Sequence, residues 1–225
     1  MLKNFFMRFL RMVIGLFIYS FGIVLTIRAN LGLAPWDVFH QGVTKHIPIT
    51  MGQASIFVGL IIVIIFCIMR EKLGLGTIFN MVLIGIFIDF FLSLKFLPDM
   101  QNFFSGLLMM IAGLFILAFA SFLYIGAGFG AGPRDGLMVA VTKRTKWPVG
   151  VVRAVIEVSV LVIGYFLGGY VGIGTVISAF GVSQAVQIVF SLLKFDVKTV
   201  KQESLIDNIK FFKAYISKRN GDGDF

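Results

Sequence analysis

Six long apolar stretches, separated by short segments that contain polar residues, follow one another along the chain. Within each stretch the apolar residues are nearly continuous, without the polar face that recurs on the helices and strands of soluble proteins. A helix needs ~20 mostly apolar residues to cross ~30 Å of hydrocarbon. The pattern therefore predicts six membrane-spanning helices, at about residues 10–28, 51–69, 75–97, 104–126, 149–168 and 174–193.

Composition agrees with a membrane location. Hydrophobic residues make up 58% of the chain and charged residues 14%, whereas an average globular domain is roughly 45–50% apolar and ~25% charged. A soluble enzyme or a nucleic-acid-binding module is excluded on this basis. The single Cys67 allows neither an intramolecular disulfide nor a cysteine-based metal cluster.

The distribution of basic residues predicts the orientation. An even number of spans puts both termini on one side, and Lys and Arg are in excess on cytoplasmic loops. With the termini in the cytoplasm, only Arg28, Lys45 and Lys95 of the 20 basic residues lie on the outer face. This arrangement accounts for the net charge of +9 without a nucleic-acid partner.

The two halves of the chain match each other at a constant offset of 98 residues, which divides it into units at 1–97 and 98–195 and a tail at 196–225. The matches include Gly32, Pro35 and Asp37 with Gly130, Pro133 and Asp135, and Gly74, Gly76 and Thr77 with Gly172, Gly174 and Thr175. Each unit holds three spans, and an odd number forces the second unit into the membrane upside down. Inverted repeats of this kind are the architecture of many secondary transporters.

A short helix is predicted between the first and second span of each unit, at about Pro35–His46 and Pro133–Arg144. Proline suits the first helical position, and an acidic residue in the first turn favours the positive end of the helix dipole. At ~1.5 Å per residue, these helices cover about half the hydrocarbon thickness. They are either re-entrant half-helices, whose N-termini meet near the midplane and attract an anion, or surface helices capped by Asp37 and Asp135.

Four motifs resemble a known family. They are Gly-Leu-Ala-Pro-Trp-Asp at 32–37, Gly-Ala-Gly-Pro-Arg-Asp-Gly-Leu-Met at 130–138, Val-Arg-Ala-Val-Ile-Glu at 152–157 and Gly-Ile-Gly-Thr at 172–175. The chain resembles the YczE-type bacterial membrane proteins, distant relatives of the YitT group, over about residues 10–195. The resemblance implies a multi-pass protein of the bacterial cytoplasmic membrane and brings no established substrate or reaction.

Charged side chains within the spans are candidates for function, since each costs at least ~2.5–3.5 kcal/mol at the centre of a membrane helix. Asp89 lies about 12 residues into the third predicted span, and its partner at the constant offset is Gln187. Asp89 is therefore a candidate for proton coupling. The alternative is a neutral carboxyl group hydrogen-bonded between helices.

A second charged group lies in the fifth span, where Arg153 and Glu157 are four residues apart and share a helix face. Either they pair with each other, or Arg153 holds an anion beside Arg134 while Glu157 positions Arg134. Arginine suits an anion site because its planar fork grips carboxylate or phosphate with two bonds. The first unit has no such charges: the counterparts of Arg134, Arg153 and Glu157 are Trp36, Ser55 and Gly59.

The remaining motifs have structural interpretations or open alternatives. Gly74-x-Gly-Thr77 and its copy at 172–175 favour close helix packing over phosphate binding, because no Lys follows as in a P-loop. His40 and His46 have no second metal ligand nearby, so no metal or other cofactor is expected. The tail has apolar residues at helical spacing beside lysines, and is either an amphipathic helix on anionic lipid with a disordered end or an ordinary basic terminus.

Together these patterns predict an all-α bundle of six transmembrane helices in two inverted three-helix repeats, each with a short re-entrant helix. The favoured function is transport of an anionic or zwitterionic solute by alternating access, not an enzymatic one. The expected solute-binding residues are Pro35, Asp37, Pro133, Arg134, Asp135 and Arg153, with Asp89 and Glu157 for proton coupling. The alternatives are a non-transporting accessory factor and an enzyme using the cluster of Arg134, Asp135, Arg153 and Glu157.

Overall fold

The computed structural model describes residues 2–69, 71–94 and 96–221, and helices are the only regular elements in this part of the chain. Six of them are long and apolar enough to cross a membrane, as predicted. They are α1 (Leu2–Arg28), α3 (Met51–Met69), α4 (Leu75–Ser93), α5 (Phe103–Gly126), α7 (Val149–Phe166) and α8 (Ile173–Leu192). The others are α2 (Pro35–Thr44), α6 (Pro133–Thr145), the 3₁₀ turn η1 (Val197–Thr199) and α9 (Leu205–Gly221).

Two helix ends differ from the prediction by four residues or more, and the others agree within two. α1 begins at Leu2 instead of residue 10, because its basic residues are bound by the end of α5 and the loop after it. Arg8 Nε donates to the Ala127 carbonyl at 2.8 Å, and Arg11 donates to the Phe122 carbonyl at 3.2 Å. α4 ends at Ser93 instead of residue 97, where the chain turns into an extended conformation at Leu94.

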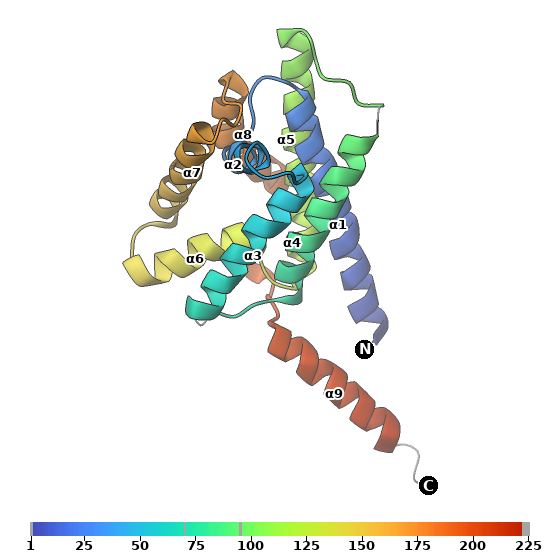
Figure 1. The fold of residues 1–225 in the computed structure, drawn as a ribbon. Helices are drawn as coiled ribbons and strands as arrows, with labels where there is room; N and C mark the ends of the chain where they lie inside the picture. The colour runs from blue at the N-terminus through green and yellow to red at the C-terminus, as the bar shows by residue number, and fades with distance from the viewer. Residues whose placement is uncertain (1, 70, 95, 222–225) are drawn as a thin grey trace.

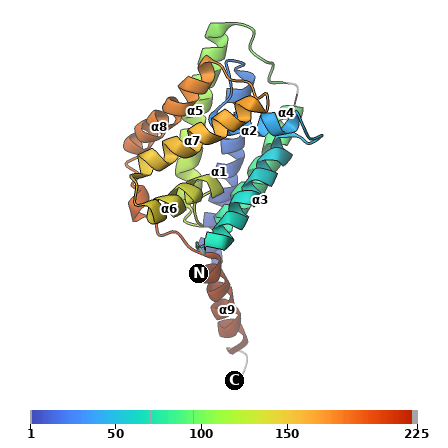
Figure 2. The ribbon, with the colours of Figure 1, turned by 60° about the vertical axis from the view of Figure 1, so that its left-hand side comes forward.

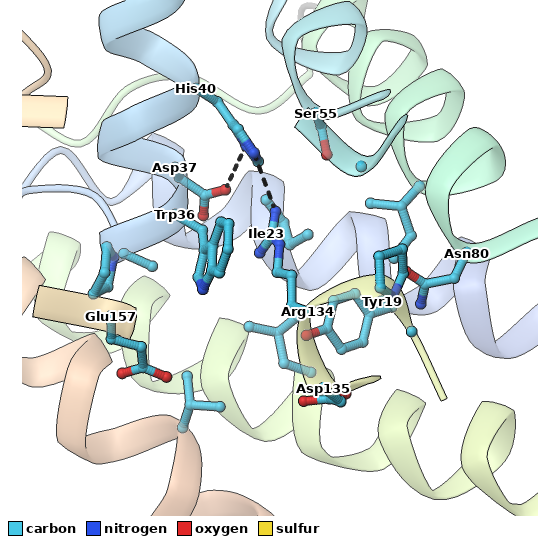
Figure 3. A pocket seen from close by; sticks show the side chains of 18 of the residues that line it. Tyr19, Ile23, Trp36, Asp37, His40, Ser55, Asn80, Arg134, Asp135 and Glu157 are labelled. Carbon is cyan, nitrogen blue, oxygen red and sulfur yellow. Dashed lines mark hydrogen bonds and ion pairs between the residues drawn. The ribbon is translucent and has the colours of Figure 1, made fainter. Parts of the chain in front are cut away.

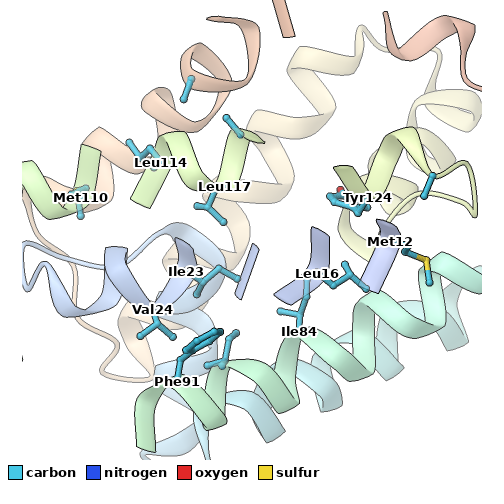
Figure 4. Packing of buried hydrophobic residues seen from close by; sticks show 14 of the residues in the cluster. Met12, Leu16, Ile23, Val24, Ile84, Phe91, Met110, Leu114, Leu117 and Tyr124 are labelled. Atoms are coloured by element: carbon cyan, nitrogen blue, oxygen red, sulfur yellow. The ribbon is translucent and has the colours of Figure 1, made fainter. Parts of the chain in front are cut away.

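The centre of the bundle is the contact between α1 and α5, on which α4 and α8 pack (Figure 1). Gly22 on α1 lies so close to α5 that an added Cβ would be 3.1 Å from the Gly113 carbonyl oxygen. Small residues at a helix crossing permit this approach. Buried residues of α1, α4 and α5 fill the core around it, among them Leu16, Ile23, Ile84, Leu114 and Leu117 (Figure 4).

The loops that lead into α2 and α6 are bound by the first turns of α8 and α4. Gly174 N–H donates to the Leu31 carbonyl at 2.7 Å, and Gly76 N–H donates to the Phe129 carbonyl at 2.8 Å. These two bonds involve residues that correspond at the offset of 98. The Gly-x-Gly-Thr motifs therefore act in packing, where the backbones of two segments touch.

Two glycines in these loops allow that contact through their backbone conformation. Gly32 has a φ of +113° and Gly130 has a φ of +106°. Residues other than glycine rarely adopt these positive φ values. A Cβ on Gly32 would lie 2.5 Å from the Gly172 nitrogen, and one on Gly130 would lie 2.9 Å from Gly74 Cα. Each loop therefore fits only against a glycine of the other half.

Both ends of the chain lie at the same end of the bundle, and α9 extends away from it (Figures 1 and 2). The segment before α9 is attached to the bundle: Arg8 pairs with Glu203 at 2.6 Å, and Leu205 N–H donates to the Leu73 carbonyl at 2.8 Å. At the start of α9, the Ser204 hydroxyl and N–H donate to Asp207 and lower the pKa of its carboxyl group. The predicted disordered end falls largely on residues 222–225, outside the described residues.

We predict that Gly74→Ala and Gly172→Ala each destabilise the protein by about 1–3 kcal/mol, the usual cost of overpacking. A Cβ at Gly74 would lie 2.2 Å from the Phe129 carbonyl oxygen, and one at Gly172 would lie 2.4 Å from that of Leu31. Thermal unfolding in detergent measures the effect. Gly150→Ala is the control because nothing lies within 4 Å of its added Cβ; equal melting temperatures for all three variants would contradict the packing argument.

Candidate functional site

The first turns of α2 and α6 line one cavity of about 130 Å³ inside the bundle (Figure 3). Its wall includes residues from every one of the helices α1 to α8. The polar and aromatic members include Tyr19, Trp36, Asp37, His40, Asn80, Tyr124, Arg134, Asp135, Arg153 and Glu157. The cavity thus gathers polar side chains in the interior of an apolar bundle.

The helix starts at the cavity lack side-chain caps. The N-cap residues, Ala34 for α2 and Gly132 for α6, supply no side-chain hydrogen bond to the first turn, and a proline follows each. N–H groups at a helix N-terminus carry a partial positive charge and are a ready-made anion site when no cap satisfies them. Pro35 and Pro133, both expected at the site, therefore bring two such ends to the same space.

Arg134 is the cation of this site that has no carboxylate partner among the described residues. Its guanidinium lies 5.0 Å from the centroid of the Trp36 ring, and Nη2 lies 3.4 Å from His40 Nε2 (Figure 3). Arginine has only donors, so in this contact His40 Nε2 is the acceptor and its proton is on Nδ1. Aromatic and imidazole groups thus hold Arg134 while its charge stays available.

Asp37 lies on the other side of His40 and is buried, with 4% of its surface exposed. Its Oδ1 is 3.5 Å from His40 Nδ1, which faces it in Figure 3. Oδ1 has no hydrogen bond within the described residues, and neither has Nε1 of Trp36. Buried polar groups are normally bonded. Oδ1 faces the His40 Nδ1–H, whereas Trp36 Nε1 has no such neighbour among the described residues, so the indole N–H is the atom that points to a ligand.

The other acidic residue expected at a helix start, Asp135, also lines the cavity. The Tyr124 hydroxyl donates to its Oδ2 at 3.2 Å, and the Tyr124 ring packs edge-on against Tyr19 with the centroids 5.8 Å apart. Two tyrosines from the central pair of helices, α1 and α5, therefore lie beside the start of α6.

Arg153 and Glu157 lie on α7 at the edge of the cavity and pair with each other, Nε to Oε1 at 2.8 Å. Of the two arrangements considered from the sequence, the structure has this one. Arg134 is positioned instead by Trp36 and His40. The Arg153 and Glu157 charges offset each other, which leaves Arg134, Asp37 and Asp135 as the other charged groups of the wall.

Asp89 does not line this cavity. It lies near the end of α4, where its Oδ1 accepts from Gly52 N–H at 2.8 Å and its Oδ2 accepts from the Thr50 hydroxyl. The carboxylate thus caps the start of α3. Gln187, its counterpart, is exposed on α8.

Sequence reasoning missed Trp36 and His40 at this site, and also Tyr19, Asn80 and Tyr124. His40 follows Asp37 by three positions and Trp36 by four, so its side chain neighbours both of them on the short helix. That spacing was the available signal. No group of three metal-ligating side chains occurs in the part of the chain that the structure describes.

Six helices of membrane-spanning length around a polar cavity define a polytopic α-helical membrane protein. The chain belongs to a family of unknown function, DUF6198, which matches residues 6–191. The resemblance to the YczE-type proteins is thereby confirmed. No solved structure matches the chain.

Three bacterial relatives are similar over most of the chain. The uncharacterized membrane protein YczE of Bacillus subtilis (strain 168) is 39% identical over 73% of this chain and 77% of its own. An uncharacterized protein of Haemophilus influenzae (strain ATCC 51907 / DSM 11121 / KW20 / Rd) is 32% identical, covering 81% and 83%. The uncharacterized protein YyaS of Bacillus subtilis is 29% identical, covering 76% and 87%.

We predict that Asp89→Ala lowers stability by ~1 kcal/mol, the usual cost of a lost N-cap, without changing the cavity. The measurement pairs thermal unfolding with Trp36 fluorescence in a Trp147→Phe background, which leaves Trp36 as the only tryptophan of the two in the chain. We expect the melting temperature to fall and the Trp36 emission maximum to stay. A shifted emission maximum with an unchanged melting temperature would place Asp89 in the site after all.

Proposed function

We propose that this protein is a transporter of the bacterial cytoplasmic membrane that moves a small zwitterionic or anionic solute by alternating access. The observation that carries this proposal is the convergence of the two uncapped helix starts, at Pro35 and Pro133, on one cavity that holds Arg134. Helix N-termini that meet inside a bundle are a recurrent way of binding substrate in secondary transporters.

The proposal includes two inverted repeats, α1 to α4 and α5 to α8, with α2 and α6 as re-entrant half-helices. Contacts that correspond at the offset of 98 support it. The contact of α1 with α4 corresponds to that of α5 with α8, and the contact of α2 with α7 corresponds to that of α6 with α3. The two glycine contacts of the loops correspond in the same way. A twofold relation between the halves is the simplest cause of such pairing. Rocking of one half against the other would then open the cavity to each side in turn.

The charges of the wall favour a zwitterion. Arg134 and the Trp36 N–H are donors without a carboxylate or carbonyl partner among the described residues, and they suit a carboxylate or phosphate. Asp37 and Asp135 are acceptors on the same wall and suit an ammonium group. A solute with both groups would pair all of these charges, which matters because unpaired buried charges are costly.

Coupling to protons is part of the proposal, and Glu157 is now the better-placed residue because it lines the cavity and Asp89 does not. A proton on Glu157 removes its attraction for Arg153, which is held at 2.8 Å in the ion pair. Arg153 is then free to join Arg134 at the anionic group. We propose no cofactor and no enzymatic activity.

For the membrane orientation, we propose that both termini are cytoplasmic and that the basic α9 lies near anionic lipid of the inner leaflet. The location of both termini at one end of the bundle supports the first point. Lysines on and before α9 support the second, because polybasic segments are attracted to anionic headgroups.

Transport tests the function directly. We predict that purified protein in liposomes takes up small zwitterions, beginning with radiolabelled glycerophosphoethanolamine, under an imposed pH gradient. Arg134→Gln should reduce uptake about tenfold or more, because a charge-assisted hydrogen bond contributes ~1.5–3 kcal/mol. Lys143→Gln is the control, since Lys143 lies on the same helix but forms an exposed ion pair with Glu71. Equal uptake by the two variants would refute the role of Arg134.

Accessibility labelling tests the inverted topology. Lys45 bonds the Gly168 carbonyl in the loop between α7 and α8, and Lys143 pairs with Glu71 in the loop between α3 and α4, at the other end of the bundle (Figure 1). In a Cys67→Ser background, we predict that Lys45→Cys reacts with an impermeant thiol reagent from outside intact cells and that Lys143→Cys reacts only after permeabilisation. Reaction of both from one side would rule out the inverted arrangement.

A further inference from the structure

The two halves differ at one place, the contact between their last two spans. α3 packs along α4, whereas the corresponding helices α7 and α8 make almost no direct contact. α7 lies on the outside of the bundle and is attached mainly through α2 (Figures 1 and 2). Because the gap between α7 and α8 has no equivalent between α3 and α4, we looked for a difference in their side chains.

Matched positions show that difference. In the first half, an added Cβ on Gly52 would lie 2.0 Å from the Gly85 carbonyl oxygen, and one on Gly59 would lie 2.6 Å from Met81 Cγ. The counterparts are Gly150 with Ser183 and Glu157 with Ala179. Nothing lies within 4 Å of a Cβ on Gly150. The first half is closed by glycine contacts, and the second has a charge and small side chains where those contacts would be.

A groove of about 210 Å³ occupies the space between α7 and α8. Its wall is formed by Gly150, Ala154, Val158 and Leu161 on α7 and by Ala179, Phe180 and Ser183 on α8. It shares Pro35, Arg153, Glu157 and Ala179 with the central cavity. The groove and the cavity are therefore adjacent, with the Arg153–Glu157 ion pair at their boundary.

The outer part of the groove is apolar and open. Val158 is 57% exposed and Phe180 is 71% exposed, and in a membrane-spanning helix such residues face hydrocarbon. The inner part ends at the charges of α7 and the start of α2. The groove thus runs from a lipid-like surrounding to a polar cavity, which is the polarity profile of an amphiphile.

The size of the cavity favours the same class of ligand. A water molecule needs ~10–15 Å³ of such space, so the cavity of about 130 Å³ holds a head group or a small solute but no acyl chain. The Trp36 indole, 7% exposed, has an unbonded Nε1 that in Figure 3 points away from Asp37, toward the space between Glu157 and Arg134. This buried donor and Arg134 fit a head-group phosphate.

We propose that the substrate is an amphiphile with a zwitterionic head group, which enters from the side, between α7 and α8. The phosphate binds at Arg134 and Trp36, the ammonium group binds at Asp37 and Asp135, and the acyl chain lies in the groove. This inference rests on the proposed function, whose solute site it extends by the chain-binding groove.

Quenching of Trp36 by a brominated acyl chain tests the lateral route. The probe is lysophosphatidylethanolamine with a brominated chain, titrated into the full chain in detergent with Trp147→Phe. Ala154→Phe fills the groove, and Val155→Phe, its neighbour outside the groove, is the matched control. We expect saturable quenching whose apparent affinity falls about tenfold in Ala154→Phe, the order of effect that overpacking produces, and is unchanged in Val155→Phe.

Glycerophosphoethanolamine, the head group without a chain, separates the two proposals. A loss in Ala154→Phe that is larger for the brominated amphiphile than for this compound supports the lateral route, and Ser183→Phe should repeat it from the α8 side. Equal affinities in Ala154→Phe and Val155→Phe overturn the route and leave the solute site intact. No response of Trp36 to either compound overturns the proposed function as well. A dimer that dissociates in Ala154→Phe would assign the groove to a second copy of the chain and also overturn the route.

Discussion

The arrangement of this protein depends on one constraint: irregular backbone in an apolar bundle needs hydrogen-bond partners from protein, because hydrocarbon offers none. The loops at 29–34 and 127–132 find these partners in the first turns of α8 and α4, through Gly174 N–H and Gly76 N–H. Such bonds require two backbones in contact, so side chains are excluded at Gly32 and Gly130. The same contacts hold the starts of α2 and α6 in the interior, and the cavity follows from that.

The electrostatics of the cavity follow from the same placement. Two helix starts without caps add positive potential, and Asp37 and Asp135 in their first turns oppose it. Arg134 adds a full charge, which the Trp36 ring and His40 hold in place without neutralising it. The result is a wall on which donors and acceptors lie close together, and this is the basis for proposing a ligand that carries both charges.

The fold was largely predictable because its signals are local. Apolar length defined the spans, and proline with a following acid defined the starts of α2 and α6 to the residue. The position of Asp89 was not predictable in this way. Counting residues along the span gives the depth of Asp89 in the helix but does not show which other helix packs beside its side chain. Asp89 caps α3, whose first turn is 37 residues away in sequence. Trp36 and His40 were missed because aromatic and imidazole groups were assessed singly, although their spacing placed them beside Asp37.

The match at a constant offset gave no sign that α3 packs along α4 while α7 and α8 make almost no contact. Matching residues in two repeats lead one to expect matching contacts. The closed pair depends on Gly52 against Gly85 and on Gly59 against Met81. The same closure in the second half would press the Glu157 carboxylate, together with Arg153 to which it is paired on α7, against Ala179 and the apolar side of α8. Taking both charges out of polar surroundings costs several kcal/mol per ion, and this cost opposes close packing of α7 on α8.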